Sequence, residues 1–273
     1  MKDSDVASGK LALTFSRRRG KTRLVDCFQV PPLKASRTLY LEGDDQATVY
    51  LVETSGGLVA GDFNEYTVNL QEGARVCLIP QSATKVYPSY NKQISKQKIM
   101  ITLDKHTFLE WNKEEIIPFE QAKYEGSTIV RMKETSVFLF AEIIYPGREK
   151  RGESFCYNML STQLQIWVEN SCCVYDPLKI YPEKLQVEKI GLLEGFAYIA
   201  SVWIITPKLD WKEEQLKALL PMEEKNHLVG VTNLKNNGLL VRWLSSNLPQ
   251  TKKEVEQVFN KVKARIQKEY PQK

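Results

Sequence analysis

Residues 55–87 read SGGLVAGDFNEYTVNLQEGARVCLIPQSATKVY, and this stretch carries the strongest fold signal in the chain. Within it, Tyr66, Val68 and Leu70 alternate with polar residues, and the alternation stops at Glu72-Gly73. Strict alternation of apolar and polar residues, bounded by a turn signal, is typical of a half-buried β-strand. The stretch therefore predicts a strand that places one face against a core.

The same pattern occurs elsewhere in the first two-thirds of the chain. Three further runs alternate in this way: residues 11–15, 99–103 and 164–168. Short strands separated by turns predict packed, antiparallel-rich sheets and a mainly β fold class. We find no internal sequence repeat and no low-complexity linker.

The ends of the opening stretch differ from an ordinary strand. Gly56, Gly57 and Gly61 lie just before the predicted strand and are followed at once by Asp62, which indicates backbone that a residue with a side chain could not easily replace. At the other end, Thr84 and Lys85 interrupt an apolar, strand-like run. No other part of the chain combines special backbone and buried-looking polar residues so densely.

The last third has a different character. Strand-like residues 191–206 precede a short helix predicted to start at Asp210-Trp211-Lys212-Glu213, and Asn236-Asn237-Gly238 predicts a hairpin turn. Thr251 and Glu254 resemble a capping box at the start of a closing amphipathic helix. These signals predict a β-α-β-β-α portion over residues 191–273. Because no linker separates it from the β-rich body, residues 1–190, we expect one domain over residues 1–273.

Composition excludes several classes of protein. The net charge of +5 is mild, and no basic run is interleaved with aromatic residues, so nucleic acid is not an expected partner. The longest apolar run, Phe196–Ile205, is too short to span a bilayer, so we expect no membrane partner. Five cysteines without a CxxC motif, and a polar N-terminus without a secretory signal, indicate a reduced, cytoplasmic protein.

Catalytic and metal-binding motifs are missing from the sequence. It has two histidines, His106 and His227, no GxSxG, no HExxH and no CxxC, so we expect no catalytic residue, no permanent metal site and no cofactor. His106 reads as a surface turn residue. Carboxylates remain: Asp62, Glu142 and Glu153 could pass a hydrated cation without holding it, or could serve as partners for an arginine or a backbone amide.

Two other motifs have more than one interpretation. The Gly56–Asp62 stretch superficially suggests an anion-binding nest, but it lacks the GK[ST] ending of a P-loop and precedes a strand rather than a helix. Arg148 and Glu153 lie in a charged turn after the apolar strand 137–144. Such a pair is a usual structural clamp, although an exposed arginine also suits a recognition surface.

Taken in order, these residues resemble the UreD family, also called UreH, of urease accessory proteins. The specific element is the pairing of a GG-x-x-x-GD segment with a later ATK-x-Y segment. The matching positions are Thr22-Arg23-Leu24, Pro32-Leu33, Arg37, Gly56–Asp62, Ala83–Tyr87, Leu109-Glu110-Trp111, Ile117-Pro118-Phe119, Glu142, Gly147-Arg148, Gly152-Glu153 and Val241-Arg242. The sequence departs from the family pattern at Phe28–Pro31 and at Asn112-Lys113.

The resemblance implies a helically wound stack of β-sheets with a few helices. It also implies a non-catalytic scaffold that binds the urease structural subunits and the accessory proteins UreF and UreG, the latter a GTPase that delivers nickel. Such proteins are further proposed to contain a water-filled passage for nickel, so that nickel would be a transient cargo and not a resident cofactor.

Three hypotheses follow. In the first, Asp62, Thr84, Lys85, Glu142 and Glu153 line or gate a nickel passage, while Gly56, Gly57, Gly61, Tyr87, Arg148 and Arg242 serve structure or partner binding. In the second, the chain is a protein–protein adaptor with a dry core, and the same polar residues form a satisfied internal network. In the third, the chain is a small β enzyme that uses the Gly-rich loop and Lys85.

Overall fold

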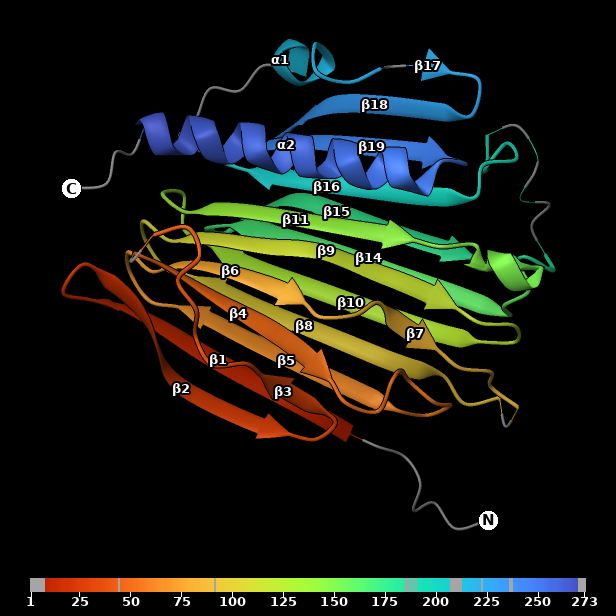
Figure 1. Ribbon diagram of the computed structural model, residues 1–273, viewed down its shortest axis with the longest axis horizontal. Coiled ribbons are helices and arrows are strands. Elements are labelled where there is room, and N and C mark those ends of the chain that lie inside the picture. Colours follow the sequence, from red (N-terminus) through yellow and green to blue (C-terminus); the bar gives the residue numbers. More distant parts are fainter. Residues whose placement is uncertain are drawn as a thin grey trace.

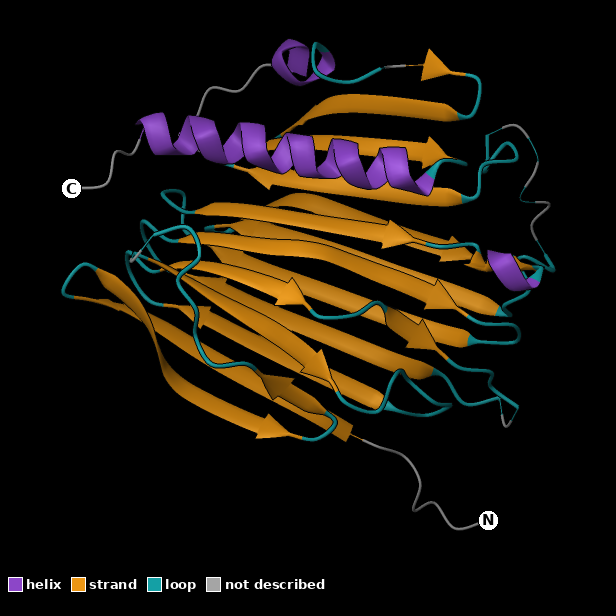
Figure 2. Cartoon of the chain, in the orientation of Figure 1, coloured by secondary structure: helices purple, strands orange, loops and turns teal. Residues whose placement is uncertain are grey.

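Two large β-sheets dominate the chain (Figure 2). The computed structural model describes residues 8–43, 45–90, 92–184, 187, 189, 191–206, 213–221, 223–235 and 238–269. Within these residues, the first sheet has the spatial order β15 (Ser171–Ile180), β14 (Met159–Val168), β10 (Lys123–Met132), β8 (Ser95–Leu103), β5 (Phe63–Leu70), β1 (Ser8–Arg18) and β2 (Lys21–Val30).

The second sheet stacks on the first (Figure 1). Its spatial order is β17 (Glu223–Glu224), β18 (His227–Leu234), β19 (Gly238–Ser245), β16 (Tyr198–Ile205), β11 (Val137–Ile144), β9 (Phe108–Pro118), β6 (Arg75–Pro80), β4 (Gln46–Glu53) and β3 (Leu33–Ala35), and β7 (Thr84–Val86) pairs with β9. The remaining elements are β12 (Gly147–Arg148), η2 (Glu149–Arg151), β13 (Glu153–Ser154), α1 (Glu213–Lys217) and α2 (Leu248–Glu269).

The chain winds from one sheet to the other through short turns that repeat in space. The steps β5 to β6, β8 to β9 and β10 to β11 all pass from the first sheet to the second. Backbone hydrogen bonds stack these turns, from Asp104 N to Leu70 O (3.0 Å) and from Lys133 N to Leu103 O (3.1 Å). The result is a solenoid-like stack, which confirms the mainly β, wound architecture.

Strand direction differs from the sequence expectation. The central neighbours β5–β8, β8–β10, β6–β9 and β9–β11 are parallel. Antiparallel pairs occur toward the margins, as in β1–β2 and β14–β15, and among β16, β18 and β19. Alternating burial normally accompanies antiparallel sheets. Here the chain winds between the two sheets, so successive strands of one sheet run in the same direction and pair parallel. The burial still alternates because one face of the first sheet contacts solvent.

The main core fills the space between the sheets. Leu11, Val68 and Ile101 from the first sheet pack in one cluster with Val76 and Leu109 from the second, and each is at most 2% exposed. The three from the first sheet come from the inward phase of the predicted alternation. Burial of such aliphatic residues contributes roughly 1.5–3 kcal/mol each.

The C-terminal portion extends the second sheet, because β16 pairs with β11. Its order follows the predicted β-α-β-β-α pattern, with the two-residue strand β17 in addition. Helix α2 lies across the outer face of β16 and β19 (Figure 1). The helix residues that were predicted to share an apolar face are buried there: Val255, Val258, Phe259, Val262 and Ile266.

The start of α2 differs from the prediction. The helix begins at Leu248, and Asn247 caps it, since its Oδ1 accepts a hydrogen bond from Gln250 N (3.2 Å). The predicted capping box at Thr251 is therefore wrong. Glu254 is instead buried, and its Oε2 lies 2.8 Å from His227 Nε2 and from Trp243 Nε1. The spacing of two polar residues in the sequence therefore does not show whether they cap a helix or belong to a buried hydrogen-bond network.

Two predicted turn motifs lie partly or wholly outside the described residues. These are residues 210–212 of the α1 start and residues 236–237 of the hairpin. The hairpin strands β18 and β19 do pair antiparallel. None of the described helices combines the length and the apolar character that crossing a bilayer requires.

Candidate functional site

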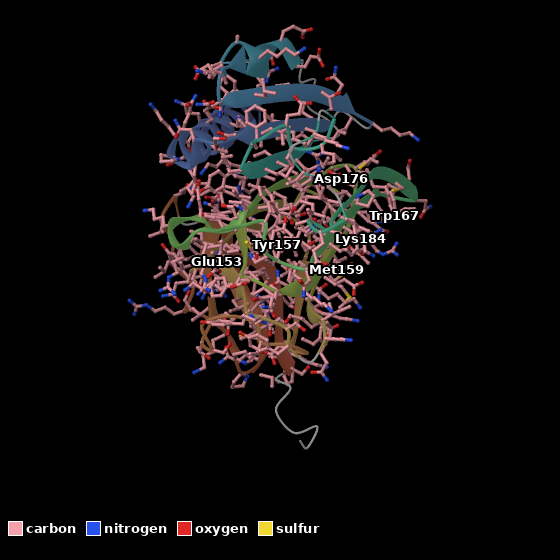
Figure 3. The ribbon with its side chains drawn as sticks, turned by 90° about the vertical axis from the view of Figure 1, so that its right-hand side faces the viewer. Glu153, Tyr157, Met159, Trp167, Asp176 and Lys184 are labelled. Carbon is pink, nitrogen blue, oxygen red and sulfur yellow. The ribbon has the colours of Figure 1, made fainter. Side chains whose placement is uncertain are left out.

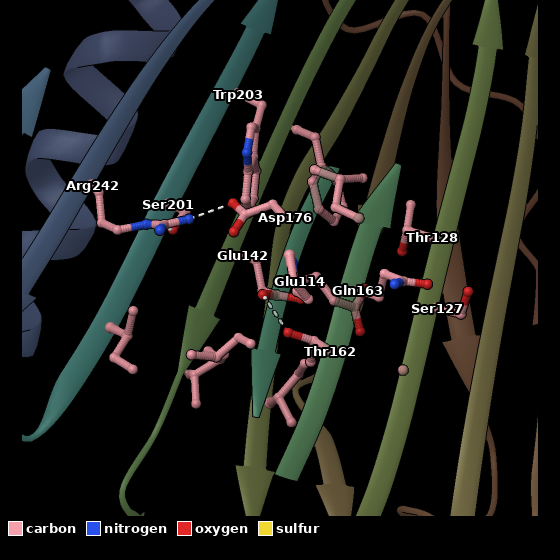
Figure 4. Close-up of a pocket in the computed structure, with 18 of the residues that line it drawn as sticks. Glu114, Ser127, Thr128, Glu142, Thr162, Gln163, Asp176, Ser201, Trp203 and Arg242 are labelled. Carbon is pink, nitrogen blue, oxygen red and sulfur yellow. Dashed lines mark hydrogen bonds and ion pairs between the residues drawn. The ribbon is translucent and has the colours of Figure 1, made fainter. Parts of the chain in front are cut away.

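A cavity of about 630 Å³ lies between the two sheets, toward their C-terminal margin. Three acidic side chains and one arginine border it, Glu114, Glu142, Asp176 and Arg242 (Figure 4). Much of the remaining wall is apolar and comes from β8, β10, β11 and β16. Its polar members are Gln97, Ser127, Thr128, Thr162, Gln163 and Ser201.

Glu114 and Glu142 are direct neighbours on adjacent strands. In the register of β9 and β11, Trp111 is opposite Phe140 and Glu114 is opposite Glu142. Three residue steps on β9 therefore match two on β11, which is a β-bulge. The extra residue places both Trp111 and Glu114 in the interior, where they are 1% and 6% exposed.

The surroundings of Glu142 favour its neutral form. The side chain is half-buried, and desolvation of its carboxyl, followed by the charges of Glu114 and Asp176, raises its pKa to about 8. Arg242 and the hydroxyl of Thr162, whose Oγ1 lies 3.5 Å from Glu142 Oε1, act in the opposite direction. Glu142 is thus largely protonated at neutral pH.

Glu114 is held by three donors. Thr84 Oγ1 donates to Glu114 Oε1 (2.7 Å), Gln97 Nε2 donates to the same oxygen (3.3 Å), and Trp111 Nε1 donates to Oε2 (3.3 Å). Burial raises the pKa of Glu114, and these hydrogen bonds partly offset the rise because they stabilise the carboxylate. Its side chain is therefore fixed in orientation and accepts hydrogen bonds from three strands.

A second, small cavity of about 20 Å³ lies on the other side of Glu114. Glu114 and Gln97 border both cavities and thus form the wall between them. Asn64 also borders the small cavity. Its side chain is 2% exposed, and its Oδ1 has no hydrogen-bond partner in the described part of the chain. This oxygen lies on the side of Gly9, because a Cβ at Gly9 would be 2.5 Å from it.

The two sequence motifs that dominate the opening stretch meet at the small cavity. Leu58 N donates to Lys85 O and Tyr87 N donates to Leu58 O, both at 2.8 Å. Gly57 has φ +144°, and a Cβ there would lie 2.5 Å from Lys85 O. Only glycine allows this approach. The Gly-rich loop and the start of β7 therefore form the outer wall, with Gly57 and Thr84 among the lining residues.

An ion pair borders the large cavity. Arg242 of β19 pairs with Asp176 of β15, and its Nε donates to Ser201 Oγ at 3.0 Å (Figure 4). The side chain of Arg242 is 42% exposed and that of Asp176 is 20% exposed. The pair joins the margins of the two sheets at a point where the cavity approaches solvent.

The structure separates the predicted site residues into two groups. Thr84 borders the small cavity, Glu142 borders the large one, and Arg242 lies at its rim. Asp62 is buried behind the Gly-rich loop, where its Oδ2 accepts a hydrogen bond from Val59 N (2.9 Å). Lys85 borders neither of the two cavities.

Glu153 is also away from the cavities. It forms an ion pair with Arg148, whose Nε donates to Glu153 Oε2 (2.7 Å), and Arg148 also lies over the ring of Phe119. Figure 3 shows Glu153 well apart from Asp176. This is the structural clamp that the sequence offered as one interpretation. Tyr87 packs edge-on against Phe119 and is 37% exposed. Gly56 and Gly61 belong to the turns of the loop, at φ +81° and +94°.

Sequence reasoning missed several polar residues at the site: Asn64, Gln97, Glu114, Asp176 and Ser201. The sequence does contain a signal for Glu114. It lies two residues before Ile116 and therefore on the same, buried face of the strand. A glutamate in an apolar phase is an indication of an interior site. The bulge after Trp111 hides that signal, since it breaks the alternation at Asn112-Lys113.

The polar side chains of the interior are distributed over both cavities. Within the described residues, no three His, Cys, Asp or Glu side chains cluster in a way that could hold a metal ion. Side-chain oxygen atoms are instead spread along the two cavities, and most of them take part in hydrogen bonds. Fold and interior thus define a class: a wound, two-sheet β protein with isolated carboxylates along internal cavities.

The chain belongs to the UreD family of urease accessory proteins. The family model described as UreD urease accessory protein matches residues 7–273. Among curated relatives, the urease accessory protein UreD of Sporosarcina pasteurii is 42% identical over 251 residues, covering 91% of this chain and 97% of the relative. Those of Lysinibacillus sphaericus and Halalkalibacterium halodurans are 41% and 40% identical, with 94% and 88% of this chain covered and 96% and 88% of each relative. The resemblance seen in the sequence is confirmed.

Proposed function

We propose that the chain is a non-catalytic scaffold of urease maturation that passes nickel through its interior. In this proposal it binds the urease structural subunits together with UreF and the GTPase UreG, in the cytoplasm. UreG releases nickel, and the chain conducts the ion toward the urease active site. Nickel is cargo here, not a resident cofactor.

The observation that carries the proposal is the wall shared by the two cavities. Glu114 faces the small cavity next to Thr84 and the large cavity next to Glu142. Side-chain oxygens that could contact a cation are therefore arranged in a series from the Gly-rich loop to the Asp176–Arg242 pair. A divalent cation could move along such a series by exchanging one set of oxygens for the next.

The energetics of the interior also support a passage. Carboxyl groups inside a two-sheet core are unfavourable unless they are paired, hydrogen-bonded or neutral. Glu142 has one long hydrogen bond, from Thr162, and a pKa near 8. A core that only joined the sheets would be more stable with an apolar residue at this position. A neutral carboxyl that ionises as a cation approaches is instead suited to brief, reversible binding.

An adaptor without a passage is the second candidate. It is favoured by the hydrogen bonds that satisfy Glu114, since a satisfied network needs no cargo. The large cavity, bordered by three acidic side chains and an arginine, argues against a dry, closed core. The enzyme hypothesis has less support. It requires Lys85 and a carboxylate to meet in one pocket, and Lys85 borders neither of the two cavities.

The proposal is tested by co-purification and activation. The tagged chain is expressed with UreF, UreG and apo-urease, and the recovered complex is supplied with nickel and GTP. We expect all partners to be retained and urease activity to depend on the chain. Failure to associate with any of them would overturn the proposal. Association together with full activation by a variant whose cavity is filled would favour the adaptor.

A further inference from the structure

We propose that the large cavity is a binding site for a small organic ammonium ion with a compact apolar body. The charged head of this ligand would lie beside Glu114 and Glu142, and its body would fill the apolar part of the cavity. The inference goes beyond the proposed function, because it assigns to the chain an organic ligand of its own. A bound ligand would also obstruct any ion that used the same space.

The lining of the cavity is the first argument. Glu142 is opposite Glu114 on β9 and Ser201 on β16, so the polar residues form one row across the second sheet. The wall on both sides of this row is apolar, and its members there include Ile116, Phe140, Ile144, Ile199 and Trp203. An apolar body in this space would remove water from these walls, which is favourable.

The volume agrees with such a ligand. Sites for small organic molecules are typically cavities of about 300–1,000 Å³ with apolar walls and a few polar groups that fix orientation. The large cavity, with about 630 Å³, has this size and this division of its wall. A row of oxygens that conducts an ion accounts for the polar residues, but it does not require the apolar space around them.

The entrance is the second argument. The second sheet extends beyond the first at this margin, because β15 is the last strand of the first sheet whereas β18 continues past β19. On β18, Leu228 is half-buried and Gly230 is exposed, and both border the cavity. Leu192 also borders it and is 41% exposed. The cavity therefore reaches the surface between apolar residues, which favours entry of a molecule with an apolar body.

Charge determines the class of the head group. Arg242 is the one cationic side chain on the cavity wall within the described residues, and it is paired with Asp176. Glu142 accepts one long hydrogen bond, from Thr162 Oγ1 at 3.5 Å, so an ammonium group could donate to its carboxylate. An organic anion would instead meet the negative charge of Glu114. The wall thus favours an organic cation.

Binding of a cation would be linked to the proton of Glu142. The pKa of Glu142 is raised to about 8, so this carboxyl is mostly protonated at pH 6. An adjacent ammonium ion favours the carboxylate, and ligand binding would therefore release the proton to solvent. The affinity should rise at least about tenfold between pH 6 and pH 8, a range in which an alkylammonium ion stays charged.

The experiment uses probes that share one apolar cage and differ in the head group: 1-adamantylamine, 1-adamantanol and 1-adamantanecarboxylate. Each probe is titrated into the purified full-length chain without nickel, and isothermal titration calorimetry gives its affinity at pH 6 and pH 8. At pH 8 we expect saturable binding of the amine at least about tenfold tighter than that of the alcohol. The carboxylate should bind most weakly.

Variants then locate the ligand. Thr128 of β10 borders the cavity, and Thr128→Trp, which fills it, should abolish binding of the amine. Glu142→Gln should reduce the affinity for the amine to about that for the alcohol and remove the pH dependence. The control is Glu110→Gln on β9, whose carboxylate lies 3.3 Å from Lys263 Nζ of α2. It should leave the binding of all three probes unchanged.

The site would be overturned by the absence of saturable amine binding, by a carboxylate that binds as tightly as the amine, or by undiminished amine binding to a folded Thr128→Trp protein. Equal affinity for the amine at pH 6 and pH 8 in the wild type would exclude the role of Glu142, and this measurement does not require Glu142→Gln to fold. The titrations need neither a partner protein nor nickel. Their failure is therefore separable from a failure of urease activation.

Discussion

Glu114 and Glu142 stand opposite each other on the parallel strands β9 and β11, and both border the same internal cavity. Their proximity has an electrostatic consequence. Two carboxylates that share a site in a poorly solvated interior cannot both ionise easily. Glu142 therefore holds its proton at neutral pH, while Glu114, with three hydrogen-bond donors, is the better stabilised anion.

The first prediction concerns pH and stability. The folded pKa of Glu142, about 8, exceeds its ordinary value of 4.5, so the folded state binds more protons between these values. Wild-type stability should therefore decline as pH rises from about 5 to about 8. Glu142→Gln lacks this titration. Its free energy of unfolding relative to wild type should increase by on the order of 2 kcal/mol between pH 6 and pH 8.

Urea unfolding at several pH values measures this difference. Glu153→Gln is the control. Arg148 lowers the pKa of Glu153 below its ordinary value of 4.5, so this carboxylate is ionised in both the folded and the unfolded state between pH 6 and pH 8, and the difference between Glu153→Gln and wild type should stay constant over that range. A constant difference between Glu142→Gln and wild type across this range would contradict the assignment.

The second prediction concerns the Gly-rich loop. Gly57→Ala should destabilise the protein by about 3 kcal/mol, because it combines an unfavourable positive φ with a Cβ that meets Lys85 O. Gly56→Ala is the matched control. It also has positive φ, but open space surrounds its Cβ position, so we expect a loss of about 1 kcal/mol. Thermal unfolding of the two variants gives the comparison, and equal losses would show that the contact with β7 is unimportant.

The third prediction concerns Asp62. Its Oδ2 accepts a hydrogen bond from Val59 N and thereby holds the loop that covers the small cavity. Asp62→Ala should retain partner assembly, lose about 1 kcal/mol of stability, and lower nickel-dependent urease activation. Asp62→Asn keeps an acceptor and should recover most of the stability. Wild-type activation by soluble Asp62→Ala would exclude a role for Asp62 in transit.

The fourth prediction concerns the rim of the large cavity. Arg242→Gln removes the ion pair that joins β19 to β15. Trp203 borders the cavity and is 3% exposed, so its fluorescence should become more accessible to acrylamide in this variant. Arg148→Gln, which breaks a clamp away from the cavity, should leave the quenching of Trp203 unchanged. Identical quenching in all three proteins would show that the Arg242–Asp176 pair does not limit access.

Much of the fold could be predicted from local pattern. Period-two alternation located β5, β8 and β14, because each has one face in the core. The 3.6-residue pattern located the buried face of α2. Strand direction could not be predicted in this way. Alternation reports which face is buried, whereas parallel pairing arises from winding, which is a property of the whole chain.

The site was less predictable than the fold. Thr84 and Glu142 were identified because each is a polar residue within an otherwise apolar strand. Glu114 was missed because the bulge in β9 changes the phase of alternation between Trp111 and Glu114. Asp62 and Glu153 share the same residue types as the cavity carboxylates, yet each is held by a local partner. Distinguishing these cases requires knowing which strands become neighbours.

The central claim is that nickel passes through the large cavity. Thr128 of β10 borders that cavity, and Ile129, the next residue, lies on the opposite face of the strand. Thr128→Trp should fill the cavity, whereas Ile129→Trp is the matched control. Each variant is purified in complex with apo-urease, UreF and UreG, and the nickel bound to urease after activation is measured. The account predicts nickel-poor urease with Thr128→Trp and normal loading with Ile129→Trp. Normal nickel loading by a folded, fully assembled Thr128→Trp complex would contradict it.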